Sequence, residues 1–414
     1  MIPWLIFFLA VMGGRFLLNT TISLLNLKAL SPDLPEEFAD TYDQEKYRQS
    51  QDYTRVQTKF SLIENTIITV ITIIFLLGGG FNLVDLFVRS FGLSSIPTGV
   101  VYAGSLALLS FILSLPFSIY STFKIEAQFG FNRTTIQTFV TDIIKSILLT
   151  AALGAPLLAA VLWFFEHTGS YGWLLCWLGT VAFGFIVQFL APVLIMPLFN
   201  RFTPLEEGPL KEKILAYARV QNFKLSGIFT MDGSKRSTKL NAFFTGFGKF
   251  RKIVFYDTLL EKIGDDELVS VLAHEMGHFK RHHIWKMMAI SILQTGLVFY
   301  LLSLFINNPG LFEAFGMEYL SIYASLFFFA FIYSPFSTLL AILFNIMLRA
   351  HEFEADNYAA RTTGAPDALV QALKKLSLAN LSNLTPHPAM VFLSYSHPPV
   401  LERIRALRET KSLP

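Results

Sequence analysis

Long uninterrupted runs of apolar residues dominate this chain and alternate with shorter polar segments. A helix needs about 20 apolar residues to cross the hydrocarbon core of a bilayer. Seven runs reach that length, at residues 3–24, 62–88, 98–120, 143–165, 171–198, 285–306 and 321–348. The pattern predicts a mostly α, polytopic membrane protein with seven transmembrane helices.

The composition agrees with a location in lipid. Of the 414 residues, 53% are hydrophobic, only 15% are charged and 42 are Phe, and the mean hydropathy is +0.50. Such values are typical of chains whose helices lie mostly in a bilayer. The first run lacks a basic leading segment and contains Arg15, so we expect a retained span rather than a cleaved signal peptide.

Lys and Arg are distributed unevenly between the polar segments. Of the 33 in the chain, 29 lie in four segments that would share one side of the membrane, residues 25–61, 121–142, 199–284 and 349–414. Because cytoplasmic loops retain Lys and Arg, these segments are predicted to face the cytoplasm and the N-terminus to lie outside. The net charge of +3 then reflects orientation in the bilayer, and we expect no nucleic-acid partner.

The spans and the segments between them divide the chain into four parts. These are residues 1–200 with five spans, 201–284 in the cytoplasm, 285–348 with two spans, and 349–414 as a cytoplasmic tail. Residues 227–231 and 252–257 are rich in apolar and aromatic side chains and predict a small β-sheet in the cytoplasmic part. The acidic residues Asp265, Asp266 and Glu267 then begin a predicted helix, because negative charge is favourable at a helix N-terminus.

That helix carries the sequence His274-Glu275-Met276-Gly277-His278. Residues four apart lie on one face of a helix, so both imidazoles can bind one metal ion while Glu275 lies beside it. This spacing is typical of zinc proteases, although the pattern is short enough to occur by chance. The only cysteine, Cys176, lies in the fifth run and excludes both a disulfide within the chain and a cysteine-based zinc site.

A hydrolytic zinc site needs a third protein ligand and an open position for water. The metzincin pattern is absent, because it requires Gly and His where this chain has Arg281 and Ile284. His282 and His283 do not have the helical spacing from His278, and we interpret them as residues at the membrane interface rather than ligands. No Asp or Glu then follows until the loop between the last two spans, which is predicted to face outward.

The first acidic residues on the cytoplasmic side after the motif directly follow the seventh span. Glu352 and Asp356 are four apart and share a helical face, whereas Glu354 points to another side and is expected to be solvated. One of the pair can bind the metal while the other holds a liganding imidazole by its second nitrogen. Topology therefore favours this pair over an ordinary charged helix face.

The chain resembles the type I CAAX prenyl endopeptidases, which are integral-membrane zinc metallopeptidases of the gluzincin kind. The resemblance covers nearly the whole length. It is carried by residues 123–135, 197–205, 234–246, 274–283, 352–356 and 395–399. It implies seven helices that form a barrel around a water-filled chamber, with the zinc site at the cytoplasmic end, and a lipidated peptide or protein substrate that is cut near its C-terminus.

The resemblance also implies a role for each site residue. It makes His274, His278 and Glu352 the ligands of one Zn²⁺ per chain, Glu275 the catalytic base, and Asp356 the partner of a liganding histidine. It also implies that Asn241 and His397 bind the substrate backbone. From the mechanism of zinc hydrolases we further expect His397 to stabilise the developing oxyanion. A monomer in the lipid bilayer is expected, in the plasma membrane of a prokaryote or the endoplasmic reticulum of a eukaryote.

Two other functions remain open from the sequence. A quality-control zinc protease of the heat-shock type would cut misfolded membrane proteins without a prenyl group, but such chains usually have fewer spans. A transporter with a structural metal site would show two related halves and a broken helix near the midplane. No such repeat is visible in the sequence.

Overall fold

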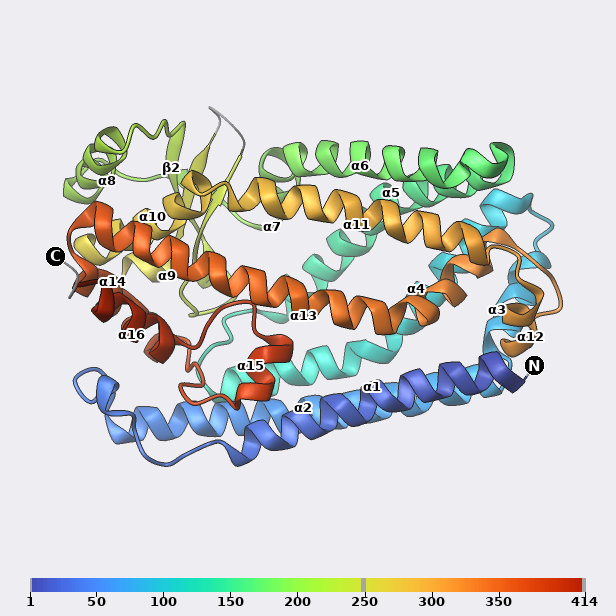
Figure 1. The fold of residues 1–414 in the computed structure, drawn as a ribbon, viewed down its shortest axis with the longest axis horizontal. Coiled ribbons are helices and arrows are strands. Elements are labelled where there is room, and N and C mark those ends of the chain that lie inside the picture. The colour runs from blue at the N-terminus through green and yellow to red at the C-terminus, as the bar shows by residue number, and fades with distance from the viewer. Residues whose placement is uncertain (1, 247–250, 412–414) are drawn as a thin grey trace.

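The computed structural model describes residues 2–246 and 251–411, and long helices make up most of it (Figure 1). Within these residues, 7 helical segments are long and apolar enough to cross a membrane. They contain the helices α1 (Ile2–Lys28), α2 (Gln44–Leu77), α4 (Ser95–Tyr120), α5 (Ile136–His167), α6 (Gly172–Leu190), α11 (His283–Phe305) and α13 (Ile322–Thr363). The predicted number of spans is confirmed.

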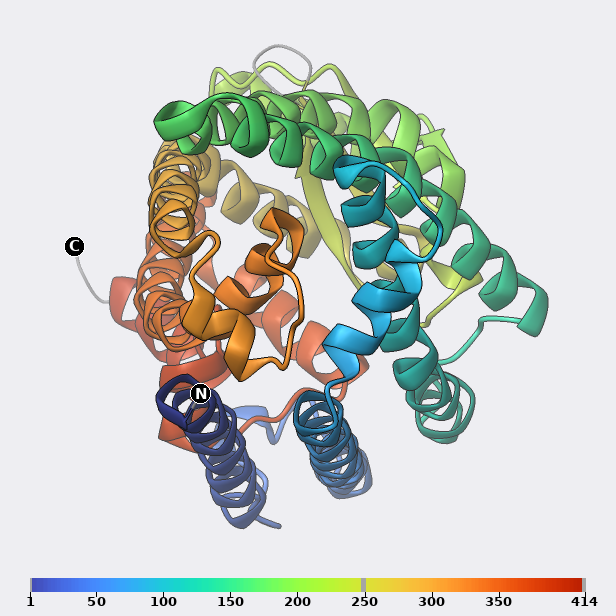
Figure 2. The ribbon, with the colours of Figure 1, turned by 90° about the vertical axis from the view of Figure 1, so that its right-hand side faces the viewer.

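The membrane helices stand around a central space, so the molecule is a helical barrel when viewed along its long axis (Figure 2). A cavity of about 900 Å³ lies between α6, α11 and α13. Its lining includes apolar side chains from all three helices, among them Phe185, Met288 and Phe344. The predicted barrel around a chamber is therefore the observed fold.

The second span differs from the predicted residues 62–88. Helix α2 begins at Gln44, where the Asp43 side chain accepts a hydrogen bond from the Lys46 amide at 2.6 Å, and it ends at Leu77. Three consecutive glycines follow, and Gly79 has a φ of +68°, a conformation that glycine adopts without steric cost. The chain turns there, and residues Gly80–Arg89 form the separate short helix α3. Continuous hydrophobicity concealed this break.

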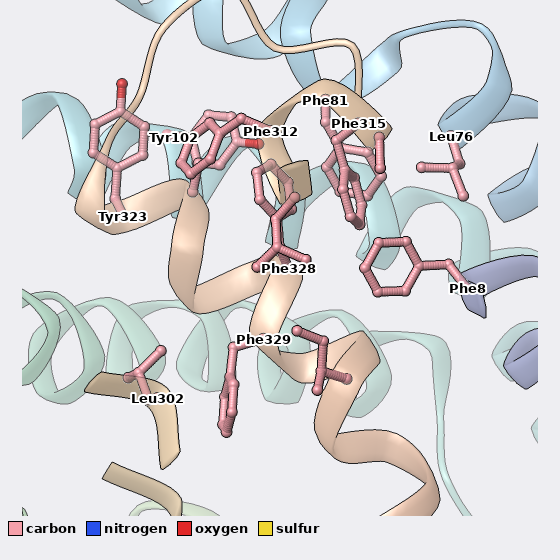
Figure 3. Close-up of a cluster of buried hydrophobic side chains, with 14 of the residues drawn as sticks. Phe8, Leu76, Phe81, Tyr102, Leu302, Phe312, Phe315, Tyr323, Phe328 and Phe329 are labelled. Carbon is pink, nitrogen blue, oxygen red and sulfur yellow. The ribbon is translucent and has the colours of Figure 1, made fainter. Parts of the chain in front are cut away.

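An aromatic cluster joins α1, α3, α13 and the short helix α12 (Pro309–Ala314) at the end of the barrel that carries the N-terminus (Figure 3). Phe315 and Phe328 stack with ring centroids 3.9 Å apart, and Phe8 and Phe81 pack against Phe315. Each aromatic side chain buries a large apolar area, so this cluster fixes the helix ends relative to one another.

The other end carries a four-stranded sheet in the order β1-β2-β4-β3. Strands β2 (Gly227–Met231) and β4 (Lys252–Tyr256) confirm the two predicted strands and pair in parallel. Strands β1 (Phe202–Pro204) and β3 (Ala242–Thr245) were not predicted, because each is too short to give a clear alternating pattern. Strand β3 pairs antiparallel with β4 and forms an edge of the sheet.

Helix α10 (Asp265–Lys280) packs across the far end of α13, beyond the apolar part of that helix. A Cβ atom at Gly277 would lie 2.9 Å from the Ala355 Cα, so glycine is required for this close approach. Helices α8 (Pro209–Val220), α14 (Pro366–Ala379), α15 (Pro388–Ser394) and α16 (Val400–Lys411) pack against α10 or α13. The short helices α7 (Met196–Phe199) and α9 (Asp257–Leu260) complete this end of the molecule.

Candidate metal centre

Helix α10 presents both histidines of the motif to α13. The helix begins at the predicted acidic residues, and the Gly264 amide donates to the Glu267 carboxylate at 2.9 Å and caps the helix start. Leu268, Leu272 and Met276 bury one face of the helix. The helix is thereby fixed against its neighbours, and His274 and His278 project toward Glu352 of α13.

The three predicted ligand atoms lie together. The Nε2 atoms of His274 and His278 are 3.2 Å apart. Glu352 places Oε1 at 3.2 Å from the His278 Nε2 and Oε2 at 3.5 Å from the His274 Nε2. Ligand atoms around a tetrahedral zinc, at metal distances of about 2.0–2.1 Å, are separated by about 3.3 Å. The observed separations therefore fit one small cation held by all three residues.

The chemistry of the donor set also fits a divalent metal. The side chain of Glu352 is only 7% exposed, and its Oε2 atom accepts no hydrogen bond within the described residues. The Arg403 Nη1 lies 3.2 Å from this oxygen and offsets part of its charge, but no hydrogen bond from the described part of the chain satisfies it, so its lone pairs remain available to a metal ion. Two imidazole nitrogens and a carboxylate oxygen are ligands that zinc accepts.

The second ring nitrogen of His274, Nδ1, contacts a carboxylate on the side away from the other two predicted ligands. This Nδ1 lies 2.7 Å from the Asp356 Oδ1, and the Arg403 guanidinium donates to both oxygens of Asp356, at 2.6 and 2.8 Å. Burial alone would lower the pKa of His274, but the hydrogen bond to Asp356 and the charge of that carboxylate raise it above its usual value. A carboxylate in this position can orient an imidazole for metal binding, which is the role predicted for Asp356.

Arg403 is the site residue that sequence reasoning missed. It lies on α16, and its Nη1 is also 3.2 Å from the Glu352 Oε2. Burial opposes its charge, yet Asp356 and Glu352 together raise its pKa. The only sequence signal is a basic residue six positions after His397, and it does not stand out among the basic residues of the tail.

The remaining predicted residues lie around a cavity of about 640 Å³ beside the three ligand atoms. Glu275, Asn241 and His397 all line it. The His397 Nε2 is 3.4 Å from the Glu352 Oε1, and its side chain is 67% exposed. Asn241 directly precedes the edge strand β3. Glu275 also lines the larger cavity between the membrane helices, so it lies where the two cavities meet.

The histidines interpreted as residues at the membrane interface have different surroundings. His282 is exposed, and its backbone has a φ of +59°. His283 is buried and lies behind His278, away from the ligand atoms, with 3.1 Å between the two Nδ1 atoms. The Glu354 carboxylate, expected to be solvated, lies 3.1 Å from the His283 Nε2 and is 48% exposed.

Comparison with known proteins agrees with this geometry. The family model described as "CAAX prenyl protease N-terminal, five membrane helices" matches residues 23–201, and the model of peptidase family M48 matches residues 204–411. The chain belongs to peptidase family M48. This M48 peptidase is therefore an integral-membrane metallopeptidase, and the transporter alternative is wrong.

Relatives of the M48 peptidase match it over almost its whole length. A "CAAX prenyl protease 1 homolog" of Oryza sativa subsp. japonica is 36% identical, and the match covers 99% of each chain. "CAAX prenyl protease 1" of Saccharomyces cerevisiae is 33% identical over 98% of this chain and 95% of its own length. The crystal structure of S. mikatae Ste24p superposes with a TM-score of 0.94 at 31% identity, covering 98% of this chain and 99% of that one.

Proposed function

We propose that the protein is a zinc endopeptidase that hydrolyses a peptide bond near the C-terminus of prenylated CAAX-type substrates. The observation that carries the proposal is the convergence of His274, His278 and Glu352 where two cavities meet. The N-terminal family match and the relatives named CAAX prenyl protease favour this substrate class over that of a heat-shock type protease.

Each side chain of the site has a distinct task in this reaction. His274, His278 and Glu352 would hold the zinc, which when bound lowers the pKa of a water molecule and polarises the scissile carbonyl. Glu275 accepts the proton of the attacking water and returns it to the departing amine. His397 donates a hydrogen bond to the developing oxyanion from its place beside Glu352.

The substrate peptide is proposed to lie along β3. This strand is an edge of the sheet, and an extended peptide can add to such an edge through backbone hydrogen bonds. Asn241 precedes the strand, and its side chain would bind the peptide backbone near the scissile bond. The lining of the smaller cavity includes aliphatic side chains, which suit the two aliphatic residues of a CAAX sequence. They are Leu240, Leu259, Leu369, Leu373 and Leu376.

The prenyl group is proposed to occupy the larger cavity. Glu275 and His278 line both cavities. With the prenyl group in the larger cavity and the C-terminal residues of the substrate in the smaller one, the peptide bond that joins these two parts would lie near the metal. The larger cavity is mainly apolar, and burying each methylene contributes about 0.8 kcal/mol. A membrane chamber beside the site therefore favours a lipidated substrate over a soluble one.

The distribution of Lys and Arg supports an orientation with the N-terminus outside and the zinc site on the cytoplasmic side. The relatives named above are eukaryotic, which fits a location in the endoplasmic reticulum membrane rather than a prokaryotic plasma membrane. All three ligands come from one chain, so a monomer with one zinc ion is sufficient for activity.

The test uses the purified protein in detergent with two peptides of one CAAX-type sequence, farnesylated and unmodified, with and without a zinc chelator. We expect cleavage of the farnesylated peptide alone, loss of cleavage with the chelator, and recovery on adding zinc. Glu275→Gln is the control for contaminating proteases. Equal cleavage of both peptides would support the heat-shock alternative, and cleavage that survives the chelator would contradict the proposal.

A further inference from the structure

Both ring nitrogens of His278 have partners, and the two partners differ in kind. The Nε2 atom faces the Glu352 Oε1 at 3.2 Å, whereas the Nδ1 atom faces the Nδ1 of His283 at 3.1 Å. His283 is the first residue of α11, and the left-handed backbone of His282 turns the chain between α10 and α11. This turn places an imidazole behind His278 that no helical spacing would predict.

The protons of this group can be assigned from its geometry. A neutral imidazole that binds a cation through Nε2 keeps its hydrogen on Nδ1. His278 therefore donates to the Nδ1 of His283, which must be an acceptor. His283 then carries its own hydrogen on Nε2, where the Glu354 Oε2 lies at 3.1 Å. With this assignment, the N–H groups of His278 and His283 each have an acceptor.

The His351 imidazole stacks on the His283 ring and fixes its orientation. The rings of His283 and His351 are stacked with centroids 3.9 Å apart and an interplanar angle of 8°. The side chain of His283 is only 3% exposed. Two imidazolium ions stacked in this way would repel each other, so the contact favours the neutral form of His283 that the hydrogen bonds require.

We infer that His283, backed by Glu354, is a positioning residue that orients His278 for metal binding, as Asp356 orients His274. The inference rests on the proposed function only in taking a metal ion to bind there. The two arrangements differ in strength, because Asp356 is a buried carboxylate whereas His283 is neutral and its carboxylate partner is half exposed. His278 is consequently the more weakly held of the two imidazole ligands.

The test is a titration of the metal-free full-length protein with zinc and, for a spectroscopic signal, with cobalt. Loss of a partner behind a liganding histidine usually lowers metal affinity by about 10–100-fold. His283→Leu removes the acceptor, and we expect a loss of affinity in that range together with a changed cobalt absorption spectrum. His283→Asn places an amide oxygen near the former Nδ1 position and should restore most of the affinity and the spectrum.

His282→Asn is the matched control, since it makes the same change at the exposed neighbour and tolerates the left-handed backbone. It should bind both metals like the unmodified protein.

If His283→Leu does not fold, Glu354→Ala replaces it, because the Glu354 side chain is half exposed and its removal is tolerated more easily. A several-fold loss of metal affinity is then expected. Unchanged metal affinity and cobalt spectrum in a folded His283→Leu or Glu354→Ala protein would overturn the inference. Because the test measures metal binding without a peptide, an error in the proposed substrate class would not change its result.

Discussion

Buried carboxylates lie beside an arginine at both ends of α13, one at the first end and two at the far end, but their oxygens are satisfied differently. At the first end, Asp85 of α3 is fully buried and both oxygens are bonded, to the Tyr323 hydroxyl at 2.5 Å and to Arg89 at 2.7 Å. At the far end, Arg403 contacts Glu352 and Asp356, yet the Glu352 Oε2 accepts no hydrogen bond and two imidazole nitrogens converge beside it.

This difference separates a network that joins helices from one that binds a ligand. A buried carboxylate such as Asp85, which accepts a hydrogen bond at each oxygen, stabilises the packing around it. Glu352 has an oxygen that accepts no hydrogen bond from the described residues and lies beside two imidazole nitrogens, so it retains lone pairs that can bind a metal ion even though Arg403 offsets part of its charge. The first end of α13 is therefore expected to matter for stability, and the far end for metal binding and catalysis.

The largest effect is expected from Glu275→Gln at the far end. The variant retains the shape of the side chain but cannot accept a proton, so turnover of a farnesylated peptide should fall by about 10²–10⁴-fold. Zinc per chain should remain that of the unmodified protein. Turnover within a factor of two of normal would exclude Glu275 as the base.

Arg403→Leu is expected to have the next largest effect, because it leaves two buried carboxylates without their shared cation. Removing one partner of a buried ion pair usually costs about 3–5 kcal/mol. In chelator, the thermal midpoint measured in detergent should therefore drop strongly. Excess zinc should recover part of the loss, because the metal restores positive charge beside Glu352. A midpoint that zinc does not affect would show that the two carboxylates are not coupled to the metal.

Asp85→Asn at the first end should have the smallest effect, and on stability alone. The amide cannot accept at both positions where the carboxylate now receives hydrogen bonds, which costs about 1–3 kcal/mol. The thermal midpoint should fall, whereas zinc per chain and turnover per folded molecule should not change. A loss of zinc from this variant would mean that the two ends of α13 are not independent.

The sequence alone predicted the far end of α13 well, because local spacing and membrane topology together constrain it. His274 and His278 are one helical turn apart, and the seventh span can deliver Glu352 and Asp356 only to the side where the histidines lie. Helix α13 continues without a break from the membrane part to these residues, so the pattern and the fold agree.

What could not be predicted depends on contacts between residues far apart in the chain. Arg403 is 47 residues from Asp356, and the tail offers several other basic residues with the same local pattern. The role of His283 depends on a left-handed turn at His282, which has no clear sequence signature. The break at Gly78–Gly80 was missed because hydrophobicity continues across it.

The most direct test of the metal centre is zinc K-edge X-ray absorption on the purified protein at one equivalent of zinc. We expect a shell of nitrogen and oxygen atoms at about 2.0–2.2 Å with outer scattering from two imidazole rings. In Glu352→Ala the oxygen contribution should change and the zinc should be lost on dialysis. A zinc shell without imidazole scattering, or zinc retained equally by the variant, would contradict a site built from α10 and α13.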